Sequence, residues 1–191
     1  MARVTEQPRP DGQRSGPLRA PMPADLSAGV WHVVPGAGHA RFSVRDKLVA
    51  IVHGSLPLRS GRAVLGPGGA LVEAVLELDV ASVDTGNPRR DRDLAKPGLL
   101  DTAAHPRVVV TAGPAAAGPE GWELSATLSA RGGSCPLALR ARLLDGGSGG
   151  AVVGVTGRLD RRGLGMKVPT LVIGRYLDLD VELLLTEAPR P

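Results

Sequence analysis

The chain has 191 residues, of which 42% are apolar and only 2% are aromatic, and its formal net charge is +4. This length is typical of one domain, or of one domain with a tail. Positive and negative side chains are mixed along the chain, and no basic block is interleaved with aromatic residues, so the sequence gives no support for nucleic-acid binding.

The first segment, residues 1–29, is predicted to be a disordered tail. It contains Pro8, Pro10, Pro17, Pro21 and Pro23 among Arg, Gln, Ser and Gly, with almost no apolar periodicity. Such a composition buries too little apolar surface to offset the entropy lost on ordering. The segment lacks the apolar core of a signal peptide, and no apolar run reaches the roughly 18 residues of a membrane span. We therefore expect a cytoplasmic protein, with a second short tail at residues 188–191.

Residues 30–187 are predicted to form one β-domain, because apolar and polar residues alternate along them, as in half-buried strands. The predicted apolar faces are Phe42 and Val44; Val52 and Leu56; Val72, Ala74, Leu76, Leu78 and Val80; Val108 and Val110; Trp122, Leu124, Ala126, Leu128 and Ala130; Leu137, Leu139 and Leu143; Val153, Val155 and Leu159; and Leu177, Leu179, Val181 and Leu183.

Clusters of Gly and Pro separate these segments, for example residues 66–69, 113–114 and 146–150. Short strands joined by such turns are typical of an antiparallel meander. With about eight strands, closing the sheet into a barrel removes the exposed edges, and such a barrel has room for a packed core or one small ligand. A sandwich has the same alternation, so this pattern leaves both architectures open.

Residues 81–106 interrupt the strands with a long polar insertion. It begins with a turn at residues 84–88, continues with the charge cluster of residues 89–93, and carries Leu94, Leu99 and Leu100. A connection of this length inside a compact domain is usually functional or a structural plug. Asp91, or Asn87 ahead of Pro88, is suited to cap a short helix here.

Residue types that support catalysis or metal binding do not form a recognisable pattern. His32, His39, His53 and His105 include no pair at helical or alternate-strand spacing, and we expect them on the surface or at strand ends. Cys135 is the only cysteine, which excludes an intrachain disulfide, and we expect it to be an exposed thiol in a turn. The sequence thus predicts no enzymatic activity, no metal and no cofactor.

Five short motifs, in order, carry a resemblance to a known family. Residues 38–45 are similar to HS-x-x-x-F-x-V-R and residues 52–56 to V-x-G-x-F, and the segment from Ser82 to Pro106 contains the central element. Residues 128–137 are similar to L-T-V-x-G-x-x-x-P-V, and residues 160–166 with Ile173-Gly174 supply the last motif. From about Val30 to Thr186 the chain therefore resembles the YceI-like proteins, which are lipocalin-like β-barrels associated with binding polyisoprenoids and related long-chain lipids.

The chain departs from the family pattern at several aromatic positions. Leu99 and Leu100 stand where the family has paired Phe, and Leu56 and Leu164 also replace Phe. Asp93 replaces a His. The loss of several rings is expected to widen or reshape the barrel interior.

The resemblance implies an eight-stranded, antiparallel, lipocalin-like β-barrel that binds or transports a long apolar ligand, polyisoprenoid or fatty-acyl-like, without catalysis. The alternative is a collapsed barrel without ligand that acts as a stress-response or protein-interaction module. A homodimer is compatible with either, although no residue specifies it. The expected ligand contacts in the barrel interior and at its mouth are Phe42, Val44, Leu56, Leu76, Leu78, Leu94, Leu99, Leu100, Val108, Val110, Leu128, Leu139, Val153, Val155 and Leu164.

Arg90 and Arg92 are the candidate contacts for a ligand head group, because guanidinium groups fork onto phosphate oxygens. In the competing interpretation, the arginines and aspartates of residues 89–93 pair with one another and hold the insertion over one end of the barrel. The alternation of acids and bases favours this mutual pairing.

Overall fold

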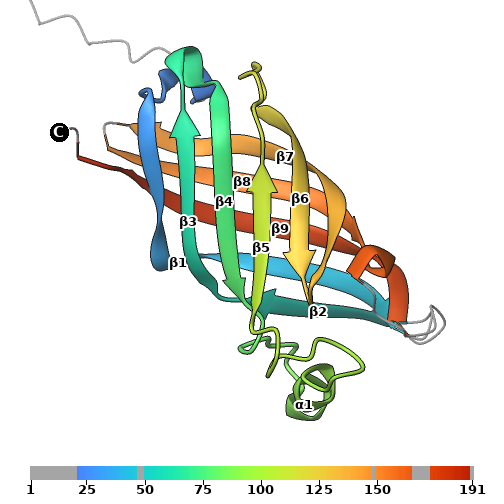
Figure 1. The fold of residues 1–191 in the computed structure, drawn as a ribbon. Helices are drawn as coiled ribbons and strands as arrows, with labels where there is room; N and C mark the ends of the chain where they lie inside the picture. Colours follow the sequence, from blue (N-terminus) through green and yellow to red (C-terminus); the bar gives the residue numbers. More distant parts are fainter. Residues whose placement is uncertain (1–20, 47–49, 148, 165–172, 190–191) are drawn as a thin grey trace, which may run out of the picture.

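A computed structural model describes residues 21–46, 50–147, 149–164 and 173–189, and these residues form a β-barrel (Figure 1). Its strands are β1 (Gly29–Asp46), β2 (Ala50–Leu56), β3 (Leu58–Leu65), β4 (Leu71–Asp79), β5 (Arg107–Ala112), β6 (Trp122–Ala130), β7 (Gly133–Gly147), β8 (Gly150–Asp160) and β9 (Ile173–Glu187).

The strands form one antiparallel sheet in the order β2-β1-β3-β4-β5-β6-β7-β8-β9, and an additional pairing of β1 with β9 closes it. Only Pro57 separates β2 from β3. These two strands pair with different halves of β1, β2 with residues 40–46 and β3 with residues 29–32. They therefore occupy one position in the wall, and the barrel has eight strand positions. The predicted eight-stranded barrel is confirmed, and the sandwich is excluded.

The predicted inner faces of β6 and β9 are confirmed. In β4, however, the alternation assigns Val72 to the inner face, and this prediction is wrong. Trp122, Ala126, Leu128 and Ala130 are buried and alternate with exposed residues. In β4, Val72 is 47% exposed, whereas Leu71 is buried. The register between β3 and β4 shifts at this point, so an irregularity in the ladder turns Val72 outward.

One end of the barrel, which we call the base, is covered by two 3₁₀ helices, η1 (Pro23–Asp25) and η2 (Pro67–Gly69). Both tryptophans lie at this end. The Trp31 indole donates to the carbonyl of Ser27, and the Trp122 indole donates to the carbonyl of Gly69 at 2.8 Å. Gly69 has φ +73°, and a Cβ there would collide with the Pro23 carbonyl, so glycine permits this close approach of η1 and η2.

The last part of the expected N-terminal tail belongs instead to this base. Pro23 and Leu26 are buried, and β1 already begins at Gly29. A single leucine and a proline have no periodicity, which is why their burial was not expected. Residues 1–20 and 190–191 of the predicted tails lie outside the described residues.

The opposite end, which we call the mouth, carries the insertion and the 3₁₀ helix η3 (Arg161–Leu164). The insertion contains the one α-helix of the described residues, α1 (Pro88–Leu94), drawn in green below the barrel in Figure 1. Asn87 caps it, accepting hydrogen bonds from the backbone N–H groups of Arg89 and Arg90. The predicted short helix and its Asn87 cap are confirmed. None of the described helices is long and apolar enough to cross a bilayer.

The sequence predicts that Cys135 is an exposed thiol in a turn, and this prediction is wrong. The residue lies in β7, is only 6% exposed, and packs beneath Gly163 of η3. Burial, with a smaller contribution from the charge of Asp160, raises the pKa of this thiol. The paired Gly132-Gly133 suggested a longer turn, but β7 begins immediately, at Gly133.

Candidate ligand-binding site

The barrel encloses a cavity of about 650 Å³. Its wall is made almost entirely of aliphatic side chains, which come from all the strands. This volume lies within the range of roughly 300–1,000 Å³ that is usual for small-molecule sites. The interior is therefore able to accept an apolar guest without unfolding of the wall.

Every residue expected in the barrel interior or at its mouth lines this cavity. The insertion contributes Leu94, Leu99 and Leu100 to the lining at the mouth, and η3 contributes Leu164. The residues from the strands are Phe42, Val44, Leu56, Leu76, Leu78, Val108, Val110, Leu128, Leu139, Val153 and Val155. The geometry brings the predicted set together, and its role in ligand binding stays a prediction.

The only phenylalanine of the chain lies over a glycine inside the barrel. Phe42 on β1 is paired directly with Gly54 on β2, and a Cβ at Gly54 would lie 2.3 Å from the end of the Phe42 ring. The ring covers a position where the wall has no side chain of its own, an arrangement known from glycines in other sheets. Gly54 thus determines how far this ring projects into the cavity.

Residues at the base also line the cavity, although the sequence motifs do not assign them to the site. They are Leu26, Trp31 and Trp122. The alternation of residues 122–130 already predicts that Trp122 lies on the inner face of its strand. Trp31 has the opposite parity to Phe42 in β1, and a register shift between Val33 and Gly38 brings both residues to the inside. No local sequence signal marks that shift.

At the mouth, the insertion adds polar residues to the lining: Thr85, Asn87, Arg89, Arg90 and Asp93. The predicted mutual pairing of arginines and aspartates in α1 is wrong. Asp91 accepts hydrogen bonds from the backbone N–H and the hydroxyl of Thr85, at 3.1 and 2.6 Å. Asp93 forms an ion pair with Lys96 at 2.6 Å, and this hydrogen bond lowers the pKa of its carboxyl group.

The arginines of α1 are consequently left without carboxylate partners. Among the described residues, Arg89, Arg90 and Arg92 make no ion pair. Arg90 is half-buried and lines the cavity, whereas Arg92 is exposed and does not. Of the two candidate head-group contacts, the structure places only Arg90 at the cavity.

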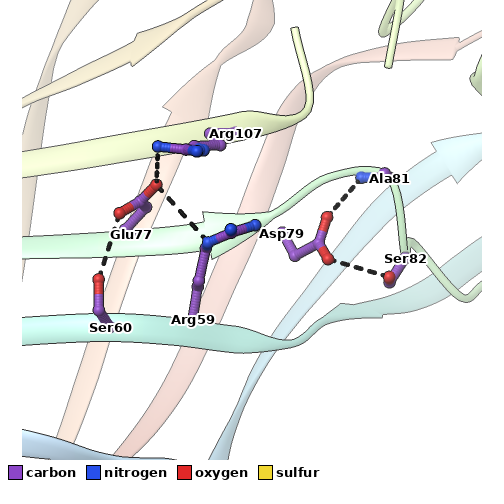
Figure 2. A network of polar contacts seen from close by, with 7 residues as sticks. All are labelled: Arg59, Ser60, Glu77, Asp79, Ala81, Ser82 and Arg107. Atoms are coloured by element: carbon purple, nitrogen blue, oxygen red, sulfur yellow. Dashed lines mark hydrogen bonds and ion pairs between the residues drawn. The ribbon is translucent and has the colours of Figure 1, made fainter. Parts of the chain in front are cut away.

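A network outside the barrel holds the two ends of the insertion (Figure 2). Glu77 of β4 forms an ion pair with Arg107 of β5 at 3.0 Å and accepts a hydrogen bond from Ser60 of β3. Asp79 accepts hydrogen bonds from the backbone of Ala81 and the hydroxyl of Ser82, where the insertion leaves β4. Farther along, Arg131 donates to the carbonyl of Pro97. Hydrogen bonds and an ion pair thus hold the insertion at its start, in its middle and where it joins β5.

Arg161 of η3 is the one buried charged residue among those described, with 2% exposure. Its guanidinium donates to the carbonyls of Gly174 and Ile173 at 2.8 and 2.6 Å, and desolvation lowers its pKa. Because backbone oxygens occupy its donors, its evident role is to join η3 to the start of β9.

No group of histidine, cysteine or carboxylate side chains within the described residues is arranged to hold a metal ion. His32 and His53 are exposed, and His39 and His105 are half-buried; none lines the cavity. The chemistry that the cavity offers is therefore apolar contact along the wall and hydrogen bonding or charge at the mouth.

Known structures share this architecture. BcnA of Burkholderia cenocepacia superimposes with a TM-score of 0.70 at 14% identity, covering 80% of this chain and 98% of that protein. A polyisoprenoid binding domain from Saccharophagus degradans, implicated in plant cell wall breakdown, gives 0.66 at 18% identity, with 83% and 98% covered. The Campylobacter jejuni YceI protein gives 0.61 at 19% identity, with 74% and 88% covered.

No curated protein sequence matches the chain significantly. The profile of the YceI-like domain, however, matches residues 31–185, which is nearly the whole barrel from β1 to β9. The chain therefore belongs to the YceI-like family.

Proposed function

We propose that this protein binds or transports a long apolar lipid, polyisoprenoid or fatty-acyl-like, inside the barrel and without catalysis. The observation that carries the proposal is the enclosed, almost wholly aliphatic cavity of about 650 Å³. The shared fold of a polyisoprenoid binding domain supports it. The same cavity argues against a collapsed barrel that acts only as a protein-interaction module.

Apolar burial alone supplies enough free energy for such binding. Each buried CH₂ group contributes roughly 0.8 kcal/mol, so about twelve of them contribute roughly 10 kcal/mol. The cost of association, estimated at about 4–15 kcal/mol, opposes this gain, so the affinity depends on how many CH₂ groups the cavity buries. Binding of a long chain through this burial needs no reactive group, in keeping with the composition of the wall.

The two ends of the cavity favour one orientation of the ligand. Trp31, Trp122 and Leu26 form an apolar base, whereas Arg90, Asn87 and Thr85 lie at the mouth. A polar head group at the base would lose its hydration without gaining a charged partner. We infer that the tail enters first and that the head group stays near α1, with Arg90 as its candidate contact.

Brominated fatty acids test both the binding and the orientation. The chain has two tryptophans, and both line the base. A fatty acid brominated near its methyl end should quench their fluorescence strongly, whereas one brominated near its carboxylate should quench weakly. Equal quenching by both would overturn the orientation.

Native mass spectrometry of the purified protein, with organic extraction, tests the function itself. We expect a co-purifying lipid, and an increase in the melting temperature when isoprenoids or fatty acids are added to delipidated protein. The proposal fails if no lipid co-purifies and no such ligand changes the melting temperature.

A further inference from the structure

Ion pairs hold exposed arginines at both ends of the barrel. Towards the base they are Arg62–Glu73 at 2.6 Å, Arg140–Glu123 at 2.9 Å and Arg142–Glu120 at 3.0 Å. Nearer the mouth they are Arg107–Glu77 at 3.0 Å, Arg158–Asp178 at 2.7 Å and Arg175–Asp160 at 2.6 Å.

Five further arginines at the mouth have no such partner. Arg45 at the end of β1, Arg89, Arg90 and Arg92 of α1, and Arg162 of η3 form no ion pair with any described residue; we call them the mouth arginines.

Four carboxylates of this end have other partners. Asp84 accepts from the backbone of Gly86, and Asp91 accepts from Thr85. Asp93 pairs with Lys96, and Asp160 pairs with Arg175 at 2.6 Å. The mouth arginines therefore present positive charge that no ion pair with a described residue neutralises.

At the base, the two arginines Arg62 and Arg142 are paired with glutamates. The mouth arginines have no such partner among the described residues, so a negatively charged surface would attract the mouth.

An exposed apolar side chain accompanies this charge. Ile51 of β2 is 62% exposed, the largest exposure among the large hydrophobic residues of the described chain. It is paired directly with Arg45 across the β1–β2 ladder, so both side chains leave the same face of the sheet near the mouth. An apolar side chain beside an unpaired arginine suits the boundary between phospholipid head groups and acyl chains.

We propose that the mouth of the barrel docks on the surface of an anionic phospholipid bilayer. The mouth arginines contact lipid phosphates, and Ile51 enters the head-group boundary. The choice of a bilayer as partner rests on the proposed lipid-binding function, because docking in this orientation places the open end of the cavity against its source of ligand.

A vesicle-binding assay with charge-matched variants tests the docking. Arg92→Gln/Arg162→Gln removes two exposed mouth charges that do not line the cavity, and Arg140→Gln/Arg142→Gln removes two exposed charges towards the base. Each arginine near an anionic surface contributes about fivefold to binding, so the mouth variant should bind roughly 25-fold more weakly. The control should lose much less.

The vesicles are compared in two compositions, pure phosphatidylcholine and phosphatidylcholine with 30% phosphatidylglycerol. We expect binding only to the anionic vesicles, with a decrease as the salt concentration rises. Equal binding to both compositions, equal losses in the two double variants, or preferential binding of an RNA or protein competitor would overturn the proposal.

Ile51→Ser tests the apolar contact, with Val72→Ser as its control, because Val72 is an exposed strand residue at the base. Ile51→Ser should weaken vesicle binding by roughly tenfold, and Val72→Ser should not.

The affinity of delipidated variants for a fluorescent fatty acid, measured without vesicles, separates this proposal from the proposed function. The Arg92→Gln/Arg162→Gln variant, whose altered side chains do not line the cavity, should retain that affinity while losing vesicle binding. Loss of both to the same extent would show that these arginines serve the ligand rather than the bilayer. Vesicle binding by a protein that takes up no lipid would refute the proposed function and leave the docking surface intact.

Discussion

Gly54 shows how a single residue can set the size of the cavity. Gly54→Ala would place a methyl group against the end of the Phe42 ring and push the ring inward. We expect a loss of affinity for a long-chain ligand and a destabilisation of about 1–3 kcal/mol from overpacking. Ligand titration and chemical denaturation measure the two effects.

Gly113→Ala is the matched control, because no heavy atom lies within 4 Å of a Cβ built there. The double variant Gly54→Ala/Phe42→Leu removes the ring and should recover both affinity and stability. If the leucine does not restore them, the contact between ring and glycine is not the cause.

Asp160 gives the stability of the protein a predictable dependence on acid. Its hydrogen bond with Arg175 lowers the pKa of its carboxyl group from the ordinary value of 3.8. The folded state therefore binds protons less readily than the unfolded state. The contribution to stability is complete above pH about 4 and is lost as the pH falls through the lowered pKa.

Denaturation at a series of pH values between 2 and 6 checks this dependence. Asp160→Asn should make the unfolding free energy less sensitive to acid, and Asp180→Asn is the control, since Asp180 forms no ion pair among the described residues. The same acid sensitivity in the Asp160→Asn variant and the parent would contradict the assignment.

At the scale of elements, a short contact between Thr85 and Asp91 helps to hold the insertion. The hydroxyl of Thr85 donates to Asp91 at 2.6 Å and ties the start of the insertion to α1. Thr85→Val keeps the shape of the side chain and removes the donor. We expect a destabilisation of about 1 kcal/mol, and faster amide exchange in residues 85–105.

Thr111→Val is the control for this substitution. Thr111 is exposed on β5, and its hydroxyl makes no hydrogen bond within the part of the chain that the structure describes. Unchanged exchange in α1 of the Thr85→Val variant would show that the contact between Thr85 and Asp91 does not hold the insertion.

The elements also show what could be predicted from sequence. Strands such as β6 were predictable because one face contacts the cavity and the other contacts water, which imposes a strict alternation. The outward turn of Val72 and the inward position of Trp31 were not, because register shifts depend on the partner strand. The partner of Asp91 was missed because composition suggests charge pairing, whereas the fold places a threonine hydroxyl closer.

For the whole molecule, the residues of the interior could be predicted from strand parity and from the motifs, whereas the structures of the base and the mouth could not. The base depends on η1 meeting η2 across the barrel, a contact between segments about 40 residues apart in the chain. The unpaired arginines of the mouth depend on which acids find partners in space. Neither property is encoded in a local pattern.

Because the base is covered by η1, η2 and both tryptophans, the barrel is a blind tube rather than a tunnel. A ligand chain can lengthen only until its end meets the tryptophans, and any further length must fold back or remain outside. For a series of saturated fatty acids, affinity should therefore increase with each added CH₂ and then level off. Gly69→Ala, which would force η2 away from Pro23, should move that plateau to longer chains, and calorimetric titration of both proteins with the same series measures the shift.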